Sequence, residues 1–259
     1  MWVAELRFTL IADTSLSRVE QAIRQYLESL IFQGQMLGRE FPTYQTEDGF
    51  ISRLLLPEPE ALQQQWHSQR GLDALQQLAT AGLGYPQLKL LGQDLMANHT
   101  DPCAVPAALI QFCSFSAMNS VLYCAEHFAP VPLYRLRRGG ADFEALIRWQ
   151  LQYQALDEIQ MQQERVLPRQ AELCLQQFGS ALNKMGYQHA RSLSTELNKP
   201  VYYYLYSGSS HNCALEGEKT CPGCGGPWRL EQPWHQLFDF RCERCQLVSN
   251  IAFDCNHSL

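Results

Sequence analysis

The feature that most constrains this chain is a pair of Cys-x-x-Cys motifs close to its C-terminal end. Cys221 and Cys224 form the first pair, Cys242 and Cys245 form the second, and seventeen residues separate the pairs. Two residues between cysteines let the backbone turn until both sulfurs face one metal, and this spacing is typical of zinc sites. Zinc binds four such ligands in a tetrahedron. The sequence therefore predicts one structural Zn²⁺ held by these four cysteines.

Other uses of the four cysteines are weaker alternatives. Two disulfides would require an oxidising compartment. A thioredoxin-like motif opens a helix, whereas Gly225, Gly226 and Pro227 follow the first pair and oppose helix formation. An iron–sulfur cluster also takes four thiolates and stays open as an alternative. Four protein ligands leave no open position on a zinc ion, so a role in folding is expected rather than catalysis.

Length and composition indicate an ordinary globular protein without a membrane segment. The chain has 259 residues, of which 46% are hydrophobic and 18% charged, which suits a main domain plus a smaller module. Met1–Arg7 carries an acid and a base, unlike a secretory signal. No apolar run reaches about eighteen residues, so no transmembrane helix is expected. We therefore expect a cytoplasmic protein whose ten cysteines are reduced thiols plus a metal site.

The charge balance argues against non-specific binding of nucleic acid. The net charge is −6, from 20 Lys and Arg against 26 Asp and Glu. Residues 219–259 hold four cations and four anions, and four zinc-bound thiolates would add a formal charge of about −2. Phosphate backbones attract proteins mainly through Lys and Arg. Any nucleic-acid hypothesis must therefore rest on local surfaces.

Alternation and helical periodicity predict a mixture of strands and helices. The Asp48-Gly49 dipeptide between two apolar runs is a strong hairpin signal. Strands are predicted at residues 2–11, 41–46, 50–56, 87–91, 107–117, 121–128 and 200–206. Helices are predicted from Ser15 or Ser17 to Gly34, over 60–81 with a break near Gly71, over 143–166, and from Pro168 to Met185 with Gly186 as the stop. This pattern predicts an α+β fold with a mostly antiparallel sheet, packed helices and a small C-terminal zinc ribbon.

Changes in composition and periodicity along the chain predict three regions. Gly139-Gly140 marks the clearest internal boundary, because a helix-rich segment follows it. We predict an α+β body over 1–138, then a helical segment and closing strand over 139–206 that pack on the body. A polar linker at 207–212 leads to the zinc ribbon over 213–259.

Three segments carry a resemblance to a known family. The cysteine quartet, the Pro130–Leu136 segment and the Lys199–Leu205 segment resemble a proteobacterial family of unknown function, described as containing a zinc ribbon and suggested to bind nucleic acid. The resemblance covers most of the chain. It implies that the four cysteines are the zinc ligands, and it implies nucleic acid as a partner.

Two groups of residues are candidates for binding nucleic acid. Guanidinium groups grip phosphates, and aromatic rings stack on exposed bases. The first group could instead be a solvated strand end, and the second could be the core that a small domain builds around its metal. The first group is Arg135, Arg137 and Arg138; the second is Arg229, Arg241 and Arg244 with Trp228 and Trp234.

Other motifs favour structural interpretations. The tyrosine run at 202–206 is more typical of a strand than of a stacking surface. Cys103, Cys124 and His127 could form a second metal site, but buried inert thiols are favoured.

Enzyme motifs are missing from the sequence. It holds no glycine-rich phosphate loop, nucleophile elbow or zincin helix. Cys113 or Cys124 could pair with His127 or His189 as nucleophile and base, which sequence alone does not test. We therefore expect a non-enzymatic protein that binds RNA or single strands, or an adaptor whose ribbon docks on a transcription or translation partner.

Overall fold

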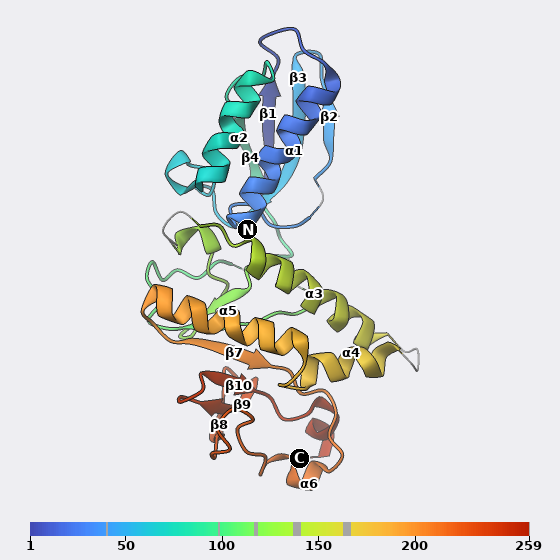
Figure 1. Cartoon of the computed structure of the whole chain (residues 1–259), viewed down its shortest axis with the longest axis vertical. Helices are drawn as coiled ribbons and strands as arrows, with labels where there is room; N and C mark the ends of the chain where they lie inside the picture. Colours follow the sequence, from blue (N-terminus) through green and yellow to red (C-terminus); the bar gives the residue numbers. More distant parts are fainter. Residues whose placement is uncertain (40, 98, 117–118, 137–140, 163–166, 259) are drawn as a thin grey trace. The chain divides into compact units, whose positions relative to one another are not determined.

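The computed structural model describes residues 1–39, 41–97, 99–116, 119–136, 141–162 and 167–258, and it divides into two compact units. The N-terminal unit comprises Met1–Pro102, Met118–Ser120 and Ala129–Glu144. The C-terminal unit comprises Cys103–Ala117, Val121–Phe128 and Ala145–Leu259. Figure 1 shows the elements of each unit.

The N-terminal unit is a four-stranded antiparallel sheet with two helices. The strand order is β2-β3-β1-β4, and every neighbouring pair is antiparallel. Along the chain the elements alternate as two interleaved split βαβ motifs, which is the ferredoxin-like topology. The elements are β1 (Trp2–Thr9), α1 (Leu16–Phe32), β2 (Thr43–Gln45), β3 (Gly49–Leu56), α2 (Gln69–Thr80) and β4 (Gln87–Gln93).

Hydrophobic burial between sheet and helices holds this unit together. Alternate residues of β1 point to the helices, because strand side chains alternate between faces. Ala4, Leu6 and Phe8 are therefore buried against apolar residues of α1 such as Ile23 and Leu30. The opposite face of β1 carries Glu5, which pairs with Arg53 of β3 at 3.1 Å.

Two local features explain where elements of this unit begin. The Ser15 side chain caps α1 by accepting the Arg18 N–H, which confirms one of the two predicted caps. Gly49 opens β3 with φ 156°, and a Cβ there would collide with the Phe8 carbonyl. A break does divide the predicted 60–81 segment, but it falls at His67 and Ser68 rather than at Gly71, since Ser68 caps α2 through the Gly71 N–H and places Gly71 inside the helix. A 3₁₀ turn, η1 (Gln64–Trp66), precedes that cap.

The C-terminal unit is built on a mixed six-stranded sheet. Its order is β6-β5-β7-β10-β9-β8, in which β7 pairs in parallel with β5 on one side and β10 on the other. The ribbon strands therefore extend the sheet that β5 to β7 begin. The strands are β5 (Leu109–Gln111), β6 (Leu122–Cys124), β7 (Val201–Leu205), β8 (Arg229–Trp234), β9 (Phe238–Cys242) and β10 (Leu247–Ser249).

The tyrosines of β7 pack on both faces of this sheet, which confirms the strand interpretation. Tyr203 faces the helices, where its hydroxyl donates to Asn183 Oδ1 at 2.6 Å. Tyr202 and Tyr204 face the other way, into an aromatic cluster with Phe238. All three side chains are buried.

Helices cover one face of the sheet (Figure 1), and the Tyr203 side chain lies on that face, in contact with Asn183. Trp149 of α3 packs against Tyr203 with ring centroids 6.0 Å apart, and its Nε1 donates to the Leu182 carbonyl at 2.9 Å. The remaining helices are α3 (Glu144–Met161), α4 (Leu167–Gln176), α5 (Ala181–Leu197) and α6 (Cys213–Glu216), with 3₁₀ turns η2 (Leu133–Arg135) and η3 (Phe253–Ser258).

Gly186 is not a helix stop, so the predicted helix from Pro168 to Met185 is wrong. The segment forms two helices, and Ser180 caps the second by accepting the Asn183 N–H at 3.1 Å. Gly186 lies inside α5, where a Cβ would fall 2.5 Å from Trp149 and 2.6 Å from Tyr203. A glycine is required there because α5 approaches the sheet too closely for any side chain.

The observed architecture confirms the α+β class, but the compact units differ from the predicted regions. Residues 103–117 and 121–128 belong with 145–259 rather than with the first part of the chain. The physical reason is the pairing of β5 with β7, which joins segments ninety residues apart. The predicted boundary at Gly139-Gly140 lies outside the described residues.

Candidate metal centre

Two tight turns aim the four cysteines at one point. In the first, the Gly225 N–H donates to the Cys221 carbonyl at 2.8 Å and Gly225 adopts φ 71°. In the second, β9 ends at Cys242, whose Sγ accepts the Cys245 N–H at 3.4 Å. Gln246 then adopts φ 52° before β10 begins. Each Cys-x-x-Cys motif is thus followed by one left-handed residue that turns the chain away.

The geometry of the sulfurs fits a tetrahedral zinc ion. All four Sγ atoms lie within 4.8 Å of one another, and Cys224 Sγ lies 3.7 Å from Cys242 Sγ. Zinc–sulfur bonds of about 2.3 Å in a tetrahedron place sulfurs about 3.8 Å apart. Cys221, Cys242 and Cys245 are buried, which suits a structural site. The donor set and spacing therefore match the four-cysteine zinc site that the sequence predicts.

Protonation of the cysteines depends on their surroundings in the metal-free protein. Burial raises the pKa of the Cys221 and Cys245 thiols. The Gly226 N–H lowers the pKa of Cys224 to about 7. Zinc binds thiolates, so zinc binding would release protons from the Cys221 and Cys245 thiols.

The neighbouring helix and a glycine hold the second turn in place. The Tyr187 hydroxyl of α5 donates to the Cys245 carbonyl at 2.8 Å, and Arg191 Nη1 donates to Gln246 Oε1 at 3.0 Å. Gly223 lies so close that a Cβ there would fall 2.9 Å from Cys245 Sγ. These contacts anchor the cluster to the helix layer of the C-terminal unit.

Most of the ribbon aromatics lie in the core. Trp228 is 4% exposed, and its Nε1 donates to the Lys219 carbonyl at 2.9 Å. Its ring packs on Phe240, with centroids 5.1 Å apart. A buried ring is not accessible to a base, so the structure favours the core interpretation for Trp228. Trp234 is half-buried at the end of β8.

The ribbon arginines occupy different environments. Arg241 is half-buried between Trp234 and Tyr202, with its Cζ 4.3 Å and 4.8 Å from the two ring centroids, and its Nε lies 2.5 Å from Glu243 Oε1. Arg229 and Arg244 are exposed, and Arg229 lies over the Phe240 ring at 5.2 Å. Arg244 immediately precedes Cys245.

Arg135 makes structural contacts within the N-terminal unit. Its guanidinium pairs with the Glu58 carboxylate and donates to the Asp101 carbonyl at 3.2 Å. The predicted phosphate-binding role is therefore disfavoured at this residue. Arg137 and Arg138 lie outside the described residues.

A second group of metal-ligand side chains lies in the C-terminal unit. One donor atom each from Cys103, Cys124 and His127 falls within 4.8 Å of the others. Cys124 Sγ lies 3.7 Å from His127 Nδ1, but Cys124 is fully buried. The pair therefore offers no accessible nucleophile. Cys113 is also buried, and burial raises its pKa well above the usual value.

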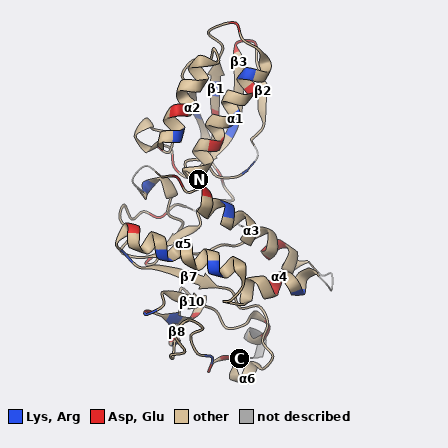
Figure 2. Ribbon diagram, in the orientation of Figure 1, with Lys and Arg blue, Asp and Glu red and all other residues tan. Residues whose placement is uncertain are grey.

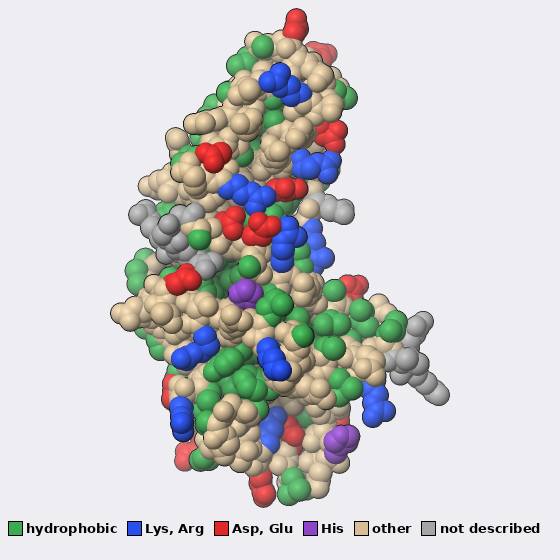
Figure 3. Space-filling view, viewed as in Figure 1, with side chains coloured by type: hydrophobic (Ala, Val, Ile, Leu, Met, Phe, Trp, Pro, Cys, Tyr) green, Lys and Arg blue, Asp and Glu red, His purple; other side chains and the backbone are tan. Residues whose placement is uncertain are grey.

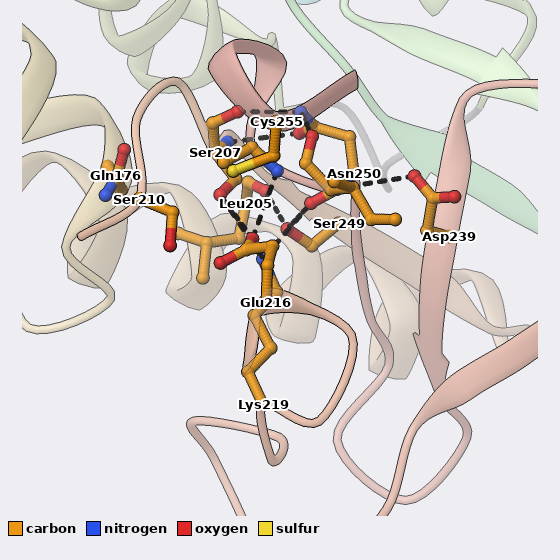
Figure 4. A network of polar contacts seen from close by, with 12 residues as sticks. Gln176, Leu205, Ser207, Ser210, Glu216, Lys219, Asp239, Ser249, Asn250 and Cys255 are labelled. Carbon is orange, nitrogen blue, oxygen red and sulfur yellow. Dashed lines mark hydrogen bonds and ion pairs between the residues drawn. The ribbon is translucent and has the colours of Figure 1, made fainter. Parts of the chain in front are cut away.

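The segment predicted to be a polar linker is held by a buried polar network (Figure 4). Asn250 accepts the Ser207 N–H at 3.0 Å and donates to the Ser207 carbonyl at 2.7 Å. Glu216 accepts from Lys219 Nζ at 2.6 Å and from the Ala252 N–H at 3.0 Å. No periodic pattern predicts these contacts, since they join short irregular segments.

A disulfide joins Cys213 of α6 to Cys255 of η3, with 5.3 Å between their Cα atoms. The prediction of reduced thiols outside the metal site is wrong for this pair. The physical reason is that the chain folds back after β10, which brings its last turn onto α6. A separation of 42 residues gave no local signal for this contact.

Comparisons with known family models divide the chain into three successive parts. Three family models match successive parts of the chain, each described as a domain of unknown function: DUF8589 at 1–92, DUF2310 at 103–206 and DUF8594 at 210–255. The first covers the ferredoxin-like elements, and the third covers the four-cysteine cluster. Among the described residues, none of the helices has the length and apolar character to cross a membrane.

Two relatives come from Haemophilus influenzae, and each is described as an uncharacterized protein. One is 30% identical over 260 residues, covering 98% of this chain and 99% of the relative. The other is 31% identical over 174 residues, covering 67% of this chain and 85% of the relative. The chain therefore belongs to the same family of unknown function as these Haemophilus proteins.

Proposed function

We propose that this protein is a non-enzymatic, zinc-dependent binder of single-stranded nucleic acid, with RNA favoured, in the cytoplasm. The observation that supports this best is the cationic surface around the second cysteine turn. Arg191 of α5 bonds to Gln246, while Arg244 lies one residue before Cys245. Helix and ribbon thus bring guanidinium groups to one short stretch of chain.

Lys184 extends this cationic surface along α5. It lies three residues before Tyr187, which is bonded to Cys245, and seven before Arg191, so one helix face carries all three. Lys184, Arg191 and Arg244 are exposed. Figure 2 shows the basic positions of α5 in blue. Flexible cations on a rigid, metal-held turn suit phosphate groups of a single strand.

The rest of the surface limits how strong this binding can be. Charges of both signs are scattered across the face in Figure 3, and the net charge is −6. Three phosphate contacts on a single strand give a slope of about −2 in log affinity against log salt. We therefore expect weak binding that is detectable at low salt and lost near physiological salt.

Fluorescence anisotropy with labelled single-stranded RNA and DNA, at stepped salt concentrations, tests the proposal. The variant combines Lys184→Glu and Arg244→Glu, and the matched control is Arg18→Glu, an exposed cation of the N-terminal unit. We expect at least tenfold weaker binding for the variant and none of that loss for the control. Undetectable binding by the zinc-loaded wild type at low salt would reject the proposal.

The second candidate is a protein adaptor acting on a transcription or translation partner. The acidic net charge of this protein fits an adaptor better than a nucleic-acid binder. The N-terminal unit has a groove of about 650 Å³ between α1 and β2, lined by both apolar and charged residues. Leu16, Ile23 and Phe41 line the groove, with Arg24 and Arg39 among its charged residues. Pull-down of a stoichiometric protein partner would favour this function if Leu16→Asp, a change at an exposed residue of the groove, abolishes the capture.

A further inference from the structure

We propose that the C-terminal unit binds a second zinc ion, held by Cys103, Cys124 and His127 and separate from the four-cysteine site. The proposal does not depend on nucleic-acid binding. It begins with donor type, since two thiolates and an imidazole are ligands that zinc prefers. Cys103 lies before β5, Cys124 is the last residue of β6, and His127 lies in the turn that follows β6.

The distances fit a bound metal rather than chance proximity. The donor atoms of the three residues lie within 4.8 Å of one another, and Cys124 Sγ lies 3.7 Å from His127 Nδ1. Zinc bonds of about 2.3 Å to sulfur and about 2.0–2.1 Å to nitrogen place these atoms about 3.6 Å apart in a tetrahedron. The three residues supply three donors of a tetrahedral site.

The backbone supplies an independent observation, because the turn at Cys124 repeats the first turn of the four-cysteine site. In the Cys124-x-x-His127 turn, the Phe128 N–H donates to the Cys124 carbonyl at 2.9 Å. The matching bond from Gly225 to Cys221 measures 2.8 Å. The residue after each second ligand is left-handed, with φ 52° at Phe128, 71° at Gly225 and 52° at Gln246.

A left-handed phenylalanine calls for an explanation. Large side chains disfavour positive φ, so neighbouring structure must hold Phe128 there. Its ring packs in the aromatic cluster, with centroids 5.1 Å from Phe112 and 5.2 Å from Phe238. That packing accounts for the ring position. A bound metal would account for the three ligand atoms that converge beside the same turn.

The second site would tie the ribbon to the other edge of the sheet. His235, at the tip of the β8–β9 hairpin, stacks on Phe128 with centroids 5.2 Å apart, and its Nε2 bonds to the Ala125 carbonyl at 2.9 Å. The hairpin that carries part of the four-cysteine site therefore rests on the Cys124–Phe128 turn. A metal there would fix the surface on which the hairpin packs.

Metal content per chain tests the proposal on the purified full-length protein. We expect two zinc ions in the wild type and one in each of Cys124→Ser, His127→Ala and Cys221→Ser. The double variant Cys124→Ser/Cys221→Ser should hold none. The matched control is Cys174→Ser, a cysteine outside both clusters, which should keep two.

The His127 variant guards against misfolding, because His127 is exposed whereas Cys124 is fully buried. Its loss of one zinc, with wild-type near-UV dichroism, would support a direct ligand role. One zinc in the wild type, or unchanged zinc in His127→Ala and Cys124→Ser, would overturn the proposal. A Cys103–Cys124 disulfide, detected by mass spectrometry of the non-reduced protein, would also overturn it. Failure of nucleic-acid binding alone would leave these counts unchanged.

Discussion

The two units of this protein solve the same problem, the burial of a sheet face, in different ways. In the N-terminal unit the four strands and both helices follow one another within the first 93 residues, and an apolar core joins them. In the C-terminal unit the sheet gathers strands from residues 109–124, 201–205 and 229–249. Its ribbon edge also carries a metal-ligand cluster and a disulfide.

The difference shows what cross-links do in a protein fold. Strands β8, β9 and β10 are three to six residues long, and tight turns connect them. Such short elements bury little apolar area, so small ribbons rely on bound metal for much of their stability. The N-terminal unit lies at the other extreme, with Leu30 and Phe8 fully buried between layers. Perturbations of metal and of core should therefore affect the two units separately.

Removal of the ribbon zinc should have the largest effect. Cys221→Ser or Cys242→Ser should release the metal and unfold β8 to β10, because structural zinc contributes about 10–16 kcal/mol in small zinc domains. Hydrogen exchange with mass spectrometry should show lost protection at residues 221–249 and unchanged protection in β1 and β3. Retention of the ribbon zinc in both variants would contradict the ligand assignment. Loss of protection in both units would contradict their separation.

Truncation of the N-terminal core should give the opposite pattern. Leu30→Ala removes a fully buried side chain of α1 and should lower the free energy of unfolding of this unit by about 2–5 kcal/mol. The zinc content should stay at the wild-type value. Leu16→Ala, in the exposed first turn of the same helix, is the matched control and should change stability by about 0.5 kcal/mol or less. Equal losses for both variants, measured by urea unfolding, would refute the burial argument.

Overpacking should destabilise the helix layer of the C-terminal unit without changing the zinc content. Gly186→Ala places a methyl group 2.5 Å from Trp149, so helix or ring must move at a cost of about 1–3 kcal/mol. Gly179→Ala is the matched control, since a Cβ there meets nothing within 4 Å. Thermal unfolding of the two variants compares them directly. A melting temperature for Gly186→Ala equal to that of the control would show that the close approach is absent.

The smallest expected effect is a pH dependence confined to the N-terminal unit. His67 Nε2 lies in hydrogen-bond contact with the Tyr26 hydroxyl at 3.0 Å, and burial lowers the pKa of His67 below the usual 6.5. The neutral side chain therefore contributes its full stability above pH 6.5. As pH falls below that value the unfolded chain binds a proton first, and stability decreases until the lower folded pKa is passed.

A comparison of wild type with His67→Gln between pH 7.5 and 5 isolates this contribution. As the pH falls, the protection of the α1 peptides from hydrogen exchange should decrease more steeply in the wild type than in the variant. Parallel pH profiles would mean that His67 titrates alike in folded and unfolded chains. Protection of the ribbon peptides is the internal control, because His67 belongs to the N-terminal unit.

The sequence alone determined the features that depend on local spacing. Residue types a few positions apart predict the two Cys-x-x-Cys motifs, the Asp48-Gly49 hairpin and the tyrosine strand. Ser15 as a helix cap belongs to the same class. These predictions succeed because backbone turns and strand alternation act over short stretches of chain.

Features that depend on distant partners emerged from the packing of the whole chain. Gly186 looked like a helix stop, yet it allows the approach of Trp149 and Tyr203 from other segments. The Cys213–Cys255 disulfide and the convergence of Cys103 on Cys124 likewise join positions that no periodicity relates. Sequence patterns fix which residues can turn, pair or bind metal, whereas the packing of the whole chain selects which of them meet.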